Sequence, residues 1–253
     1  MNVGPQDGCA WITGASSGLG RGLALRLARA GWRVVASARN AAALAALAHE
    51  SDHITAQPVD IAQDAAVAQA VLDIEASISP IGLAVLNAGL HVPVRARTLH
   101  AAEFRQLADV NLLGTVNCLA AVLPAMIRRR RGQIAIVASV AGYRGLPTAA
   151  AYSMTKAGLI AMAEALKPEL DLLGIRLQIV NPGFVRTPLT ERNRFPMPFL
   201  MDLDDAVAAF HRGLESERFE IVFPRSLAYM MKILRLLPYP LAFAITRRLV
   251  PRD

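Results

Sequence analysis

Short runs of apolar and β-branched residues alternate along the chain with longer stretches rich in alanine and leucine. The short runs have the length and composition of buried strands, and the long stretches repeat their apolar positions with helical spacing. Strands are predicted at residues 9–13, 33–37, 54–59, 83–87, 133–139, 176–181 and 220–224, and helices at 20–31, 41–50, 62–77, 104–127 and 152–174. Strands that alternate with helices form right-handed crossovers, so the pattern predicts an α/β fold with a parallel sheet and helices on both faces.

The alternation runs along the chain without a low-complexity linker or an internal repeat, which favours a single domain over residues 1–253. Within this domain we separate a core at 8–190, a loop at about 188–203 that follows the sixth strand, and an apolar, basic tail at 225–253. Apolar residues make up 54% of the chain and charged residues 19%. This composition permits a large buried core and differs from that of a disordered protein.

Charge and cysteine content narrow the function classes. The net charge is +7, but the cations are scattered apart from the run Arg128–Arg131. That run closes an apolar helical stretch, where cations complement the helix dipole, so we interpret it as a solvated helix end and expect no nucleic-acid partner. The alternative is that this run binds an anionic surface.

Cys9 and Cys118 lack metal or disulfide spacing, so we expect no metal site and a reduced setting. The N-terminus has no signal-peptide core, so we expect the protein in the cytoplasm.

Chemically distinctive residues follow the predicted strands. The glycine-rich segment TGASSGLG at 13–20 follows the first strand, and the segments ARN, VD, NAG, AS and NPG follow the next five. Because ligands of parallel sheets bind beyond the carboxyl ends of the strands, these segments predict the rim of one binding site. The glycines let the backbone come close to a pyrophosphate, although a tight connection would also explain them.

In the order of these motifs the chain resembles the short-chain dehydrogenase/reductase family, whose glycine motif is T-G-x-x-x-G-x-G, over nearly all of residues 8–190. The resemblance implies a single Rossmann-type domain with a doubly wound parallel sheet, and a nicotinamide cofactor. For Asn87 and Asp60 a role in fixing a loop by hydrogen bonds is the alternative. The cofactor-binding residues that the family resemblance implies are Gly14, Ser16, Ser17, Gly18, Leu19, Gly20, Arg39, Asn40, Asp60, Ile61, Asn87, Ala88, Gly89, Tyr152, Lys156, Pro182, Gly183, Val185 and Thr187.

The residue after the second strand indicates which nucleotide binds. Rossmann domains that take NAD commonly hold the free ribose 2′-hydroxyl with an acidic residue about 20 positions beyond the glycines. This chain has Arg39 in that region and no carboxylate. A guanidinium pairs with a 2′-phosphate, so the sequence favours NADP(H) over NAD(H). An exposed arginine without a partner is the alternative.

The resemblance also implies a catalytic tetrad of Asn111, Ser139, Tyr152 and Lys156. Tyr152 and Lys156 are four positions apart on a predicted helix and therefore share a face. For Tyr152 to act as a base, the pKa of its phenol must fall from about 10 to near 7, which requires about 4 kcal/mol. A unit charge about 4 Å away supplies that amount at an effective dielectric of about 20. Ser139 would bind the substrate oxygen, and Asn111 would hold a water for proton relay.

These observations predict an NADP(H)-dependent oxidoreductase that interconverts a carbonyl and an alcohol. The short interval between Tyr152 and Lys156 favours reduction of C=O over C=C within the family, and family members are commonly dimers or tetramers. Apolar residues of the loop, Phe195, Met197, Phe199, Leu200 and Met201, either cover an apolar substrate or pack against the domain. Tyr143 is a further candidate for the wall of this pocket.

The tail leaves three arrangements open, because Leu227, Met231 and Leu234 can share one helical face with Met230 and Leu237 while Lys232 and Arg235 lie elsewhere. The tail would pack on a partner subunit, cap its own substrate pocket, or lie on a membrane surface. Two other function classes also remain: a catalytically silent NADP-binding scaffold or sensor, and a peripheral membrane protein that uses the tail.

Overall fold

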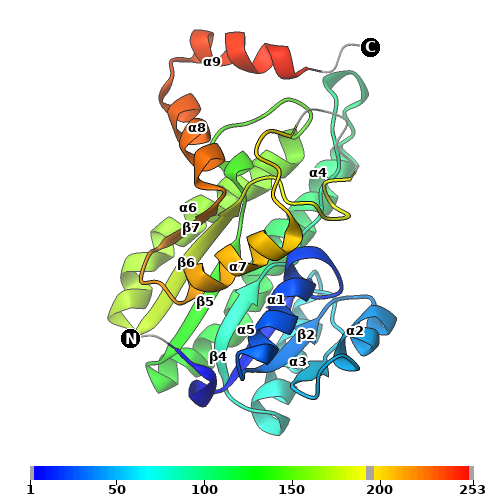
Figure 1. Cartoon of the computed structure of the whole chain (residues 1–253), viewed down its shortest axis with the longest axis vertical. Helices are drawn as coiled ribbons and strands as arrows, with labels where there is room; N and C mark the ends of the chain where they lie inside the picture. Colours follow the sequence, from blue (N-terminus) through cyan, green and yellow to red (C-terminus); the bar gives the residue numbers. More distant parts are fainter. Residues whose placement is uncertain (1–2, 192–196, 251–253) are drawn as a thin grey trace.

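The computed structural model describes residues 3–191 and 197–250 of the chain, which form one parallel sheet flanked by helices (Figure 1). The seven strands lie in the order β3-β2-β1-β4-β5-β6-β7. Their bounds are β1 Cys9–Thr13, β2 Arg33–Ser37, β3 Ile54–Ala56, β4 Ile81–Leu86, β5 Gly132–Val137, β6 Ile175–Pro182 and β7 Glu220–Phe223. All six strand pairs are parallel, and the order reverses between β1 and β4. The predicted doubly wound sheet is confirmed, and its switch point is where such sheets bind ligands.

Helices cover both faces of the sheet, as the pattern predicts. Their bounds are α1 Gly18–Arg29, α2 Ala41–Ala48, α3 Asp64–Ser77, α4 Ala101–Leu107, α5 Gly114–Arg129, α6 Ala150–Leu172, α7 Leu203–Leu214, α8 Arg225–Leu236 and α9 Tyr239–Thr246. Helices α1, α2 and α7 pack against one face, around Leu27, Leu44 and Phe210. Helices α3, α5 and α6 pack against the other, around Trp11 and Leu159. Each face therefore has its own apolar core.

Three elements differ from the prediction. Strand β3 ends at Ala56, before Pro58, whose nitrogen has no hydrogen to donate to a ladder. Helix α7 is not predicted, because its acidic first turn resembles a loop, yet it buries Val207 and Phe210. The long helix predicted at 104–127 is two helices, α4 and α5, joined by a π-helical turn, η3, at Ala108–Leu113. Wide turns of this kind are frequent at functional sites, and this one contains Asn111.

The combined helix Ala101–Arg129 is the one helix among the described residues that is long and apolar enough to cross a membrane. Its apolar character has a simpler origin in this fold. The α5 part buries Cys118, Leu119 and Val122 in the core against the sheet. A core helix of a doubly wound domain has the same composition as a short membrane span, so this helix is no evidence for one.

Candidate active site

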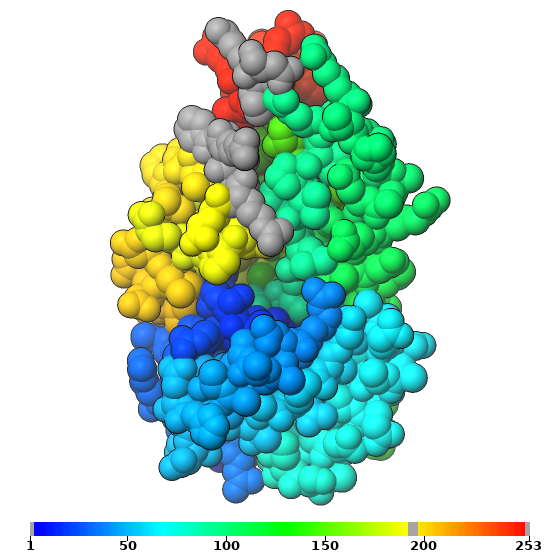
Figure 2. All heavy atoms as spheres, turned by 90° about the vertical axis from the view of Figure 1, so that its right-hand side faces the viewer, coloured from blue at the N-terminus to red at the C-terminus, as the bar shows by residue number. Residues whose placement is uncertain are grey.

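A cavity of about 930 Å³ lies along the carboxyl ends of the strands. Figure 2 shows the face of the molecule that is hollowed there, between the segment that follows β6 and the helices from the middle of the chain. One end of the cavity is the glycine-rich turn between β1 and α1, and the other is formed by residues of α8, α9 and the following 3₁₀ turn, η5, at Arg247–Leu249. Every residue predicted to bind the nucleotide lines this cavity except Gly20, which lies just behind the turn.

The glycine turn is held by hydrogen bonds to the chain after β4. Gly14 has a φ of +68°, and a Cβ there would lie 2.7 Å from the Cα of Ala88. A Cβ on Gly20 would lie 2.4 Å from the carbonyl oxygen of Gly14. The Asn87 side chain donates to the carbonyl oxygens of Thr13 and Gly14 at 3.0 and 3.2 Å. Asn87 therefore fixes the turn, which is the structural alternative that the sequence left open for it.

The N-terminus of α1 faces the same turn. Ser17 is its N-cap, but the Ser17 side chain makes no capping hydrogen bond. The first amides of α1 are thus available to an anion, and the helix dipole favours negative charge at this point. Gly18, at a φ of +54°, lets the backbone turn here without a side chain. These features fit a nucleotide pyrophosphate.

The residues predicted to contact the adenosine part have mixed roles. Arg39 is exposed on the cavity wall and has no hydrogen-bond or ion-pair partner among the described residues. Asn40 caps α2, since its side-chain oxygen accepts from the amide of Ala43 at 3.0 Å. The carboxylate of Asp60 accepts from the amide of Ala62 at 3.1 Å, and Ile61 lines the wall beside it. Asn40 and Asp60 shape their loops, whereas the exposed Arg39 leaves both of its predicted alternatives open.

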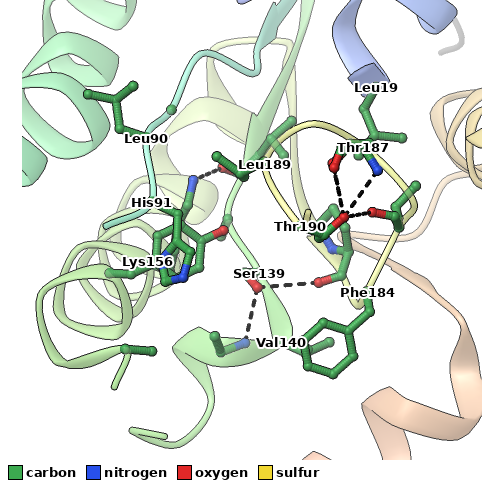
Figure 3. A pocket seen from close by; sticks show the side chains of 18 of the residues that line it. Leu19, Leu90, His91, Ser139, Val140, Lys156, Phe184, Thr187, Leu189 and Thr190 are labelled. Atoms are coloured by element: carbon green, nitrogen blue, oxygen red, sulfur yellow. Dashed lines mark hydrogen bonds between the residues drawn. The ribbon is translucent and has the colours of Figure 1, made fainter. Parts of the chain in front are cut away.

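Three of the four predicted catalytic residues, Ser139, Tyr152 and Lys156, line the cavity. Figure 3 shows Ser139 and Lys156 on its wall. Ser139 follows β5 and donates to the carbonyl oxygen of Pro182 at 3.3 Å, while its Oγ accepts from the amide of Ala141 at 3.1 Å. Tyr152 and Lys156 come from the first turns of α6, where the four-residue spacing aligns them. The Lys156 Nζ lies 5.6 Å from the centre of the Tyr152 ring.

The electrostatics of this pair differ from the prediction. Burial raises the pKa of Tyr152 to about 12, and Ser139 opposes that rise only in part. Burial also lowers the pKa of Lys156 to about 8. The Lys156 ammonium donates to the carbonyl oxygen of Val137 at 2.8 Å and is not aimed at the phenol oxygen. Desolvation therefore outweighs the charge of Lys156 in the protein alone, and the pKa of Tyr152 is raised where the sequence analysis expects it to be lowered.

Asn111, the fourth predicted catalytic residue, lies behind the cavity wall and is fully buried in the π-helical turn. Its side-chain oxygen accepts from the amide of Leu90 at 2.7 Å. Its side-chain nitrogen donates to the carbonyl oxygen of Leu90 at 2.9 Å and to Thr155 Oγ1 at 3.1 Å. The side-chain amide of Asn111 thus links the chain after β4 to α6, at the residue that precedes Lys156. Its predicted role in holding a water stays a prediction.

Two residues near the site behave differently from the sequence analysis. His91, which it missed, lines the cavity with its ring 4.9 Å from that of Tyr152 in an edge-on arrangement. Its position two residues beyond the NAG segment is the signal that could have indicated it.

Tyr143, a predicted candidate for the pocket wall, does not line the cavity. It donates to the carboxylate of Glu220, and burial raises its pKa, with the Glu220 hydrogen bond adding to the rise.

The loop at about 188–203 contributes to the wall through Pro188, Leu189, Thr190 and Pro198. The residues predicted as a cover differ in their environment: Phe199 is exposed, Met201 is half-buried and packs against the core, and Phe195 lies outside the described residues. Thr190 Oγ1 donates to the carbonyl oxygen of Val185 at 2.6 Å, which anchors the loop next to Thr187.

The tail caps the cavity of its own chain, which is the second of the three predicted arrangements. Leu227, Met231 and Leu234 of α8 are buried, and they line the cavity together with Met230 and Leu237 on the predicted helical face. A Cβ on Gly183 would lie 2.6 Å from Leu227 Cδ2, so α8 packs directly on the segment after β6. The opposite face of the tail remains exposed.

Comparisons with known proteins agree with this arrangement. A family model described as short chain dehydrogenase matches residues 8–196. An uncharacterized oxidoreductase of Myxococcus xanthus is 42% identical, over 95% of this chain and 96% of the relative. The 2-dehydro-3-deoxy-L-rhamnonate dehydrogenase (NAD(+)) of a Sphingomonas strain is 34% identical, over 73% of this chain and 74% of the relative.

Among solved structures, a short chain dehydrogenase from Burkholderia cenocepacia in complex with NADP superposes with a TM-score of 0.84 at 28% identity, over 99% of this chain and 100% of that chain. The sheet order, the glycine turn and the family match agree with one another, and six of the seven strands lie within the matched residues. The chain belongs to the short-chain dehydrogenase family and is an oxidoreductase of that family.

Proposed function

We propose that the chain is an NADP(H)-dependent enzyme that interconverts an apolar ketone or aldehyde and the corresponding alcohol. One observation carries the proposal: Ser139, Tyr152 and Lys156 lie together in a cavity between a glycine turn suited to a nucleotide and a predominantly apolar far end. When bound, the nicotinamide supplies or accepts the hydride. The side chains of this chain position the substrate and manage its proton.

Each residue has a role that follows from its position. Ser139 Oγ is held by Pro182 and Ala141 at the wall and would donate to the substrate oxygen as charge develops there. Tyr152 would exchange the proton with the same oxygen. Because burial raises the pKa of Tyr152 to about 12, the phenol is protonated near neutrality, which favours donation to a carbonyl. Lys156 would bind the nicotinamide ribose.

Arg39 supports NADP(H) as the cofactor, because a free guanidinium at the cavity edge suits a 2′-phosphate. The Burkholderia cenocepacia structure that the chain resembles contains NADP, whereas the Sphingomonas relative is named for NAD(+). If the assignment is right, NADPH binds more tightly than NADH, and Arg39→Gln lowers that preference by about tenfold or more. NADH affinity should be unchanged in this variant. Equal affinities in the unaltered protein would contradict the assignment.

The catalytic assignment is tested by a screen of ketones, aldehydes and alcohols that follows the absorbance of the cofactor. Tyr152→Phe should lower turnover by about 10²–10⁴-fold, because the proton donor is lost, and should leave NADPH binding intact. Full activity of this variant would refute the role of Tyr152. Binding of NADPH without turnover of any substrate would instead favour the scaffold or sensor.

The proposal also includes a cytoplasmic location and a homo-oligomeric state. Cys9 and Cys118 are free, and burial raises the pKa of each thiol to about 12, which suits a reduced cytoplasm. Helix α5 exposes Leu113, at its N-cap, and Val116, one turn further on. This apolar stripe supports a homodimer or homotetramer, since members of the family commonly form oligomers.

A further inference from the structure

The outer face of the tail is apolar as well as the inner one. Ten of the seventeen large hydrophobic side chains that are exposed among the described residues lie between positions 229 and 250. The most exposed of them are Leu236, Tyr239, Tyr229 and Ile233, at 83%, 67%, 64% and 62%. Helix α8 thus has apolar residues on both faces, although only one face packs on the domain. A concentration of this kind marks an interaction surface.

Figure 1 shows α8 and α9 projecting beyond the carboxyl ends of the strands, away from the body of the domain. Helix α9 buries Ala242 and Thr246 and exposes Leu241, Phe243 and Ile245. The rings of Tyr239 and Phe243 stack on each other with their centres 5.4 Å apart. Two short helices at an angle, with exposed aromatic side chains, have the form of segments that lie at the boundary of a lipid bilayer.

The charge of the tail decides between a bilayer and a protein partner. No acidic residue occurs between Glu220 and Asp253, whereas six cations lie there, at Arg225, Lys232, Arg235, Arg247, Arg248 and Arg252. Lys232 pairs with Glu220, and Arg235 donates to the carbonyl oxygen of Tyr143. Arg247 and Arg248 are exposed and form no ion pair in the described part of the chain. Two copies joined through this face would bring like charges together, whereas an anionic leaflet would complement them.

Some exposed apolar residues of the tail also line the cavity. Met230, Ile233, Ile245 and Leu249 line the cavity and are also exposed, at 43%, 62%, 48% and 43%. An apolar molecule that leaves a bilayer beneath α8 and α9 would therefore reach the cavity without crossing bulk water. The tail residues that cap the pocket and those that face outward form one continuous apolar surface.

We propose that α8, α9 and η5 dock on the surface of an anionic membrane, and that the substrate is a lipid-borne ketone, aldehyde or alcohol that enters the cavity from that membrane. The docking stands on the exposed residues and charges alone, whereas the substrate class rests on the proposed function. The tail lies at the headgroup boundary and does not cross the bilayer, since its helices have 12 and 8 residues.

The test is cosedimentation of the full chain, loaded with NADPH, with phosphatidylcholine vesicles that contain or lack phosphatidylserine. We expect binding to the anionic vesicles that weakens at high salt. Leu236→Ser combined with Phe243→Ser should abolish it, and Arg247→Gln combined with Arg248→Gln should weaken it by about tenfold or more. Matched controls change equally exposed residues elsewhere, Leu172→Ser for the apolar pair and Arg29→Gln with Arg128→Gln for the cations. The controls should bind like the unaltered protein.

Three outcomes would overturn the docking: no binding to anionic vesicles, equal loss of binding in the controls, or a soluble dimer that Leu236→Ser with Phe243→Ser dissociates. Tyr152→Phe should bind vesicles normally, so a failure of the catalytic proposal leaves this test intact. With vesicles that carry a long-chain ketone, the apolar double variant should lose turnover while it still reduces a short soluble ketone. Equal turnover of both ketones by this variant would refute delivery from the membrane.

Discussion

The glycine turn at one end of the cavity and the tail helices at the other are packed in opposite ways. At the turn, main-chain atoms lie against one another with no room for a Cβ on Gly14 or Gly20, and Asn87 fixes the arrangement. At the tail, one face of α8 packs inward while its outer side chains are exposed. The first end has one geometry that admits little change, as suits a cofactor common to a family. The second end can vary its side chains without disturbing the turn, as suits a substrate.

The largest effect that this contrast predicts is that of a single methyl group at the turn. Gly20→Ala would place a Cβ 2.4 Å from the carbonyl oxygen of Gly14, and crowding of this kind costs about 1–3 kcal/mol. We expect NADPH affinity, measured by fluorescence titration, to fall by about ten- to hundredfold. Gly145→Ala is the matched control, because nothing lies within 4 Å of its Cβ position. If both variants bind NADPH equally well, the turn is less constrained than its contacts indicate.

The nucleotide end could be predicted from the sequence because its determinants are local. Gly14, Gly18 and Gly20 stand in one short segment, and the strands that end at this rim have distinctive apolar runs. Tyr152 and Lys156 are one helical turn apart, so their shared face followed from spacing alone. Asn87 has a contact that is distant in sequence, with Thr13, yet its place after a strand together with the family resemblance identified it.

The acidity of Tyr152 and the packing of the tail depend on contacts that no short segment of sequence specifies. Whether the Tyr152 phenol becomes more or less acidic depends on the balance between burial and charge, and burial is a property of the folded chain. The tail could cap the pocket or leave it, because the apolar pattern of α8 suits either arrangement. One contact that holds the tail joins Arg235 of α8 to the carbonyl oxygen of Tyr143, 92 positions away. For the same reason, Tyr143 appeared to be a pocket residue and is not one.

A smaller effect on NADPH affinity is expected at Lys156, which lies between the two ends of the cavity. Burial lowers its pKa to about 8, so the free protein loses this positive charge as the pH rises through 8. If the charged form binds the nicotinamide ribose, NADPH affinity is full below pH 8 and falls by about tenfold above it. Lys156→Met should show weak binding without this pH dependence. Lys167→Met changes a half-buried lysine of the same helix that does not line the cavity, and it should behave like the unaltered protein. A binding constant that is flat between pH 7 and 10 would contradict the role.

The smallest effect is expected at the tail, where Glu220 of β7 holds α8. Its carboxylate accepts from Tyr143, from Asn181 at 2.9 Å and from Lys232 of α8. Burial raises the pKa of Glu220, but these hydrogen bonds outweigh it and the net pKa lies below its ordinary value of 4.5. The interaction is therefore present at neutral pH and is lost only as the pH falls through that lowered pKa.

Lys232→Met removes the α8 partner of Glu220 while it keeps an apolar side chain on the helix. Because Lys232 is 45% exposed, the ion pair contributes only about 0.2–1 kcal/mol. We expect the KM for an apolar ketone to rise about two- to fivefold, with kcat and NADPH affinity unchanged, since only the cap of the cavity is loosened. Lys167→Met again serves as the control. A fall in NADPH affinity in Lys232→Met would show that the two ends of the cavity are coupled and that the contrast between them does not hold.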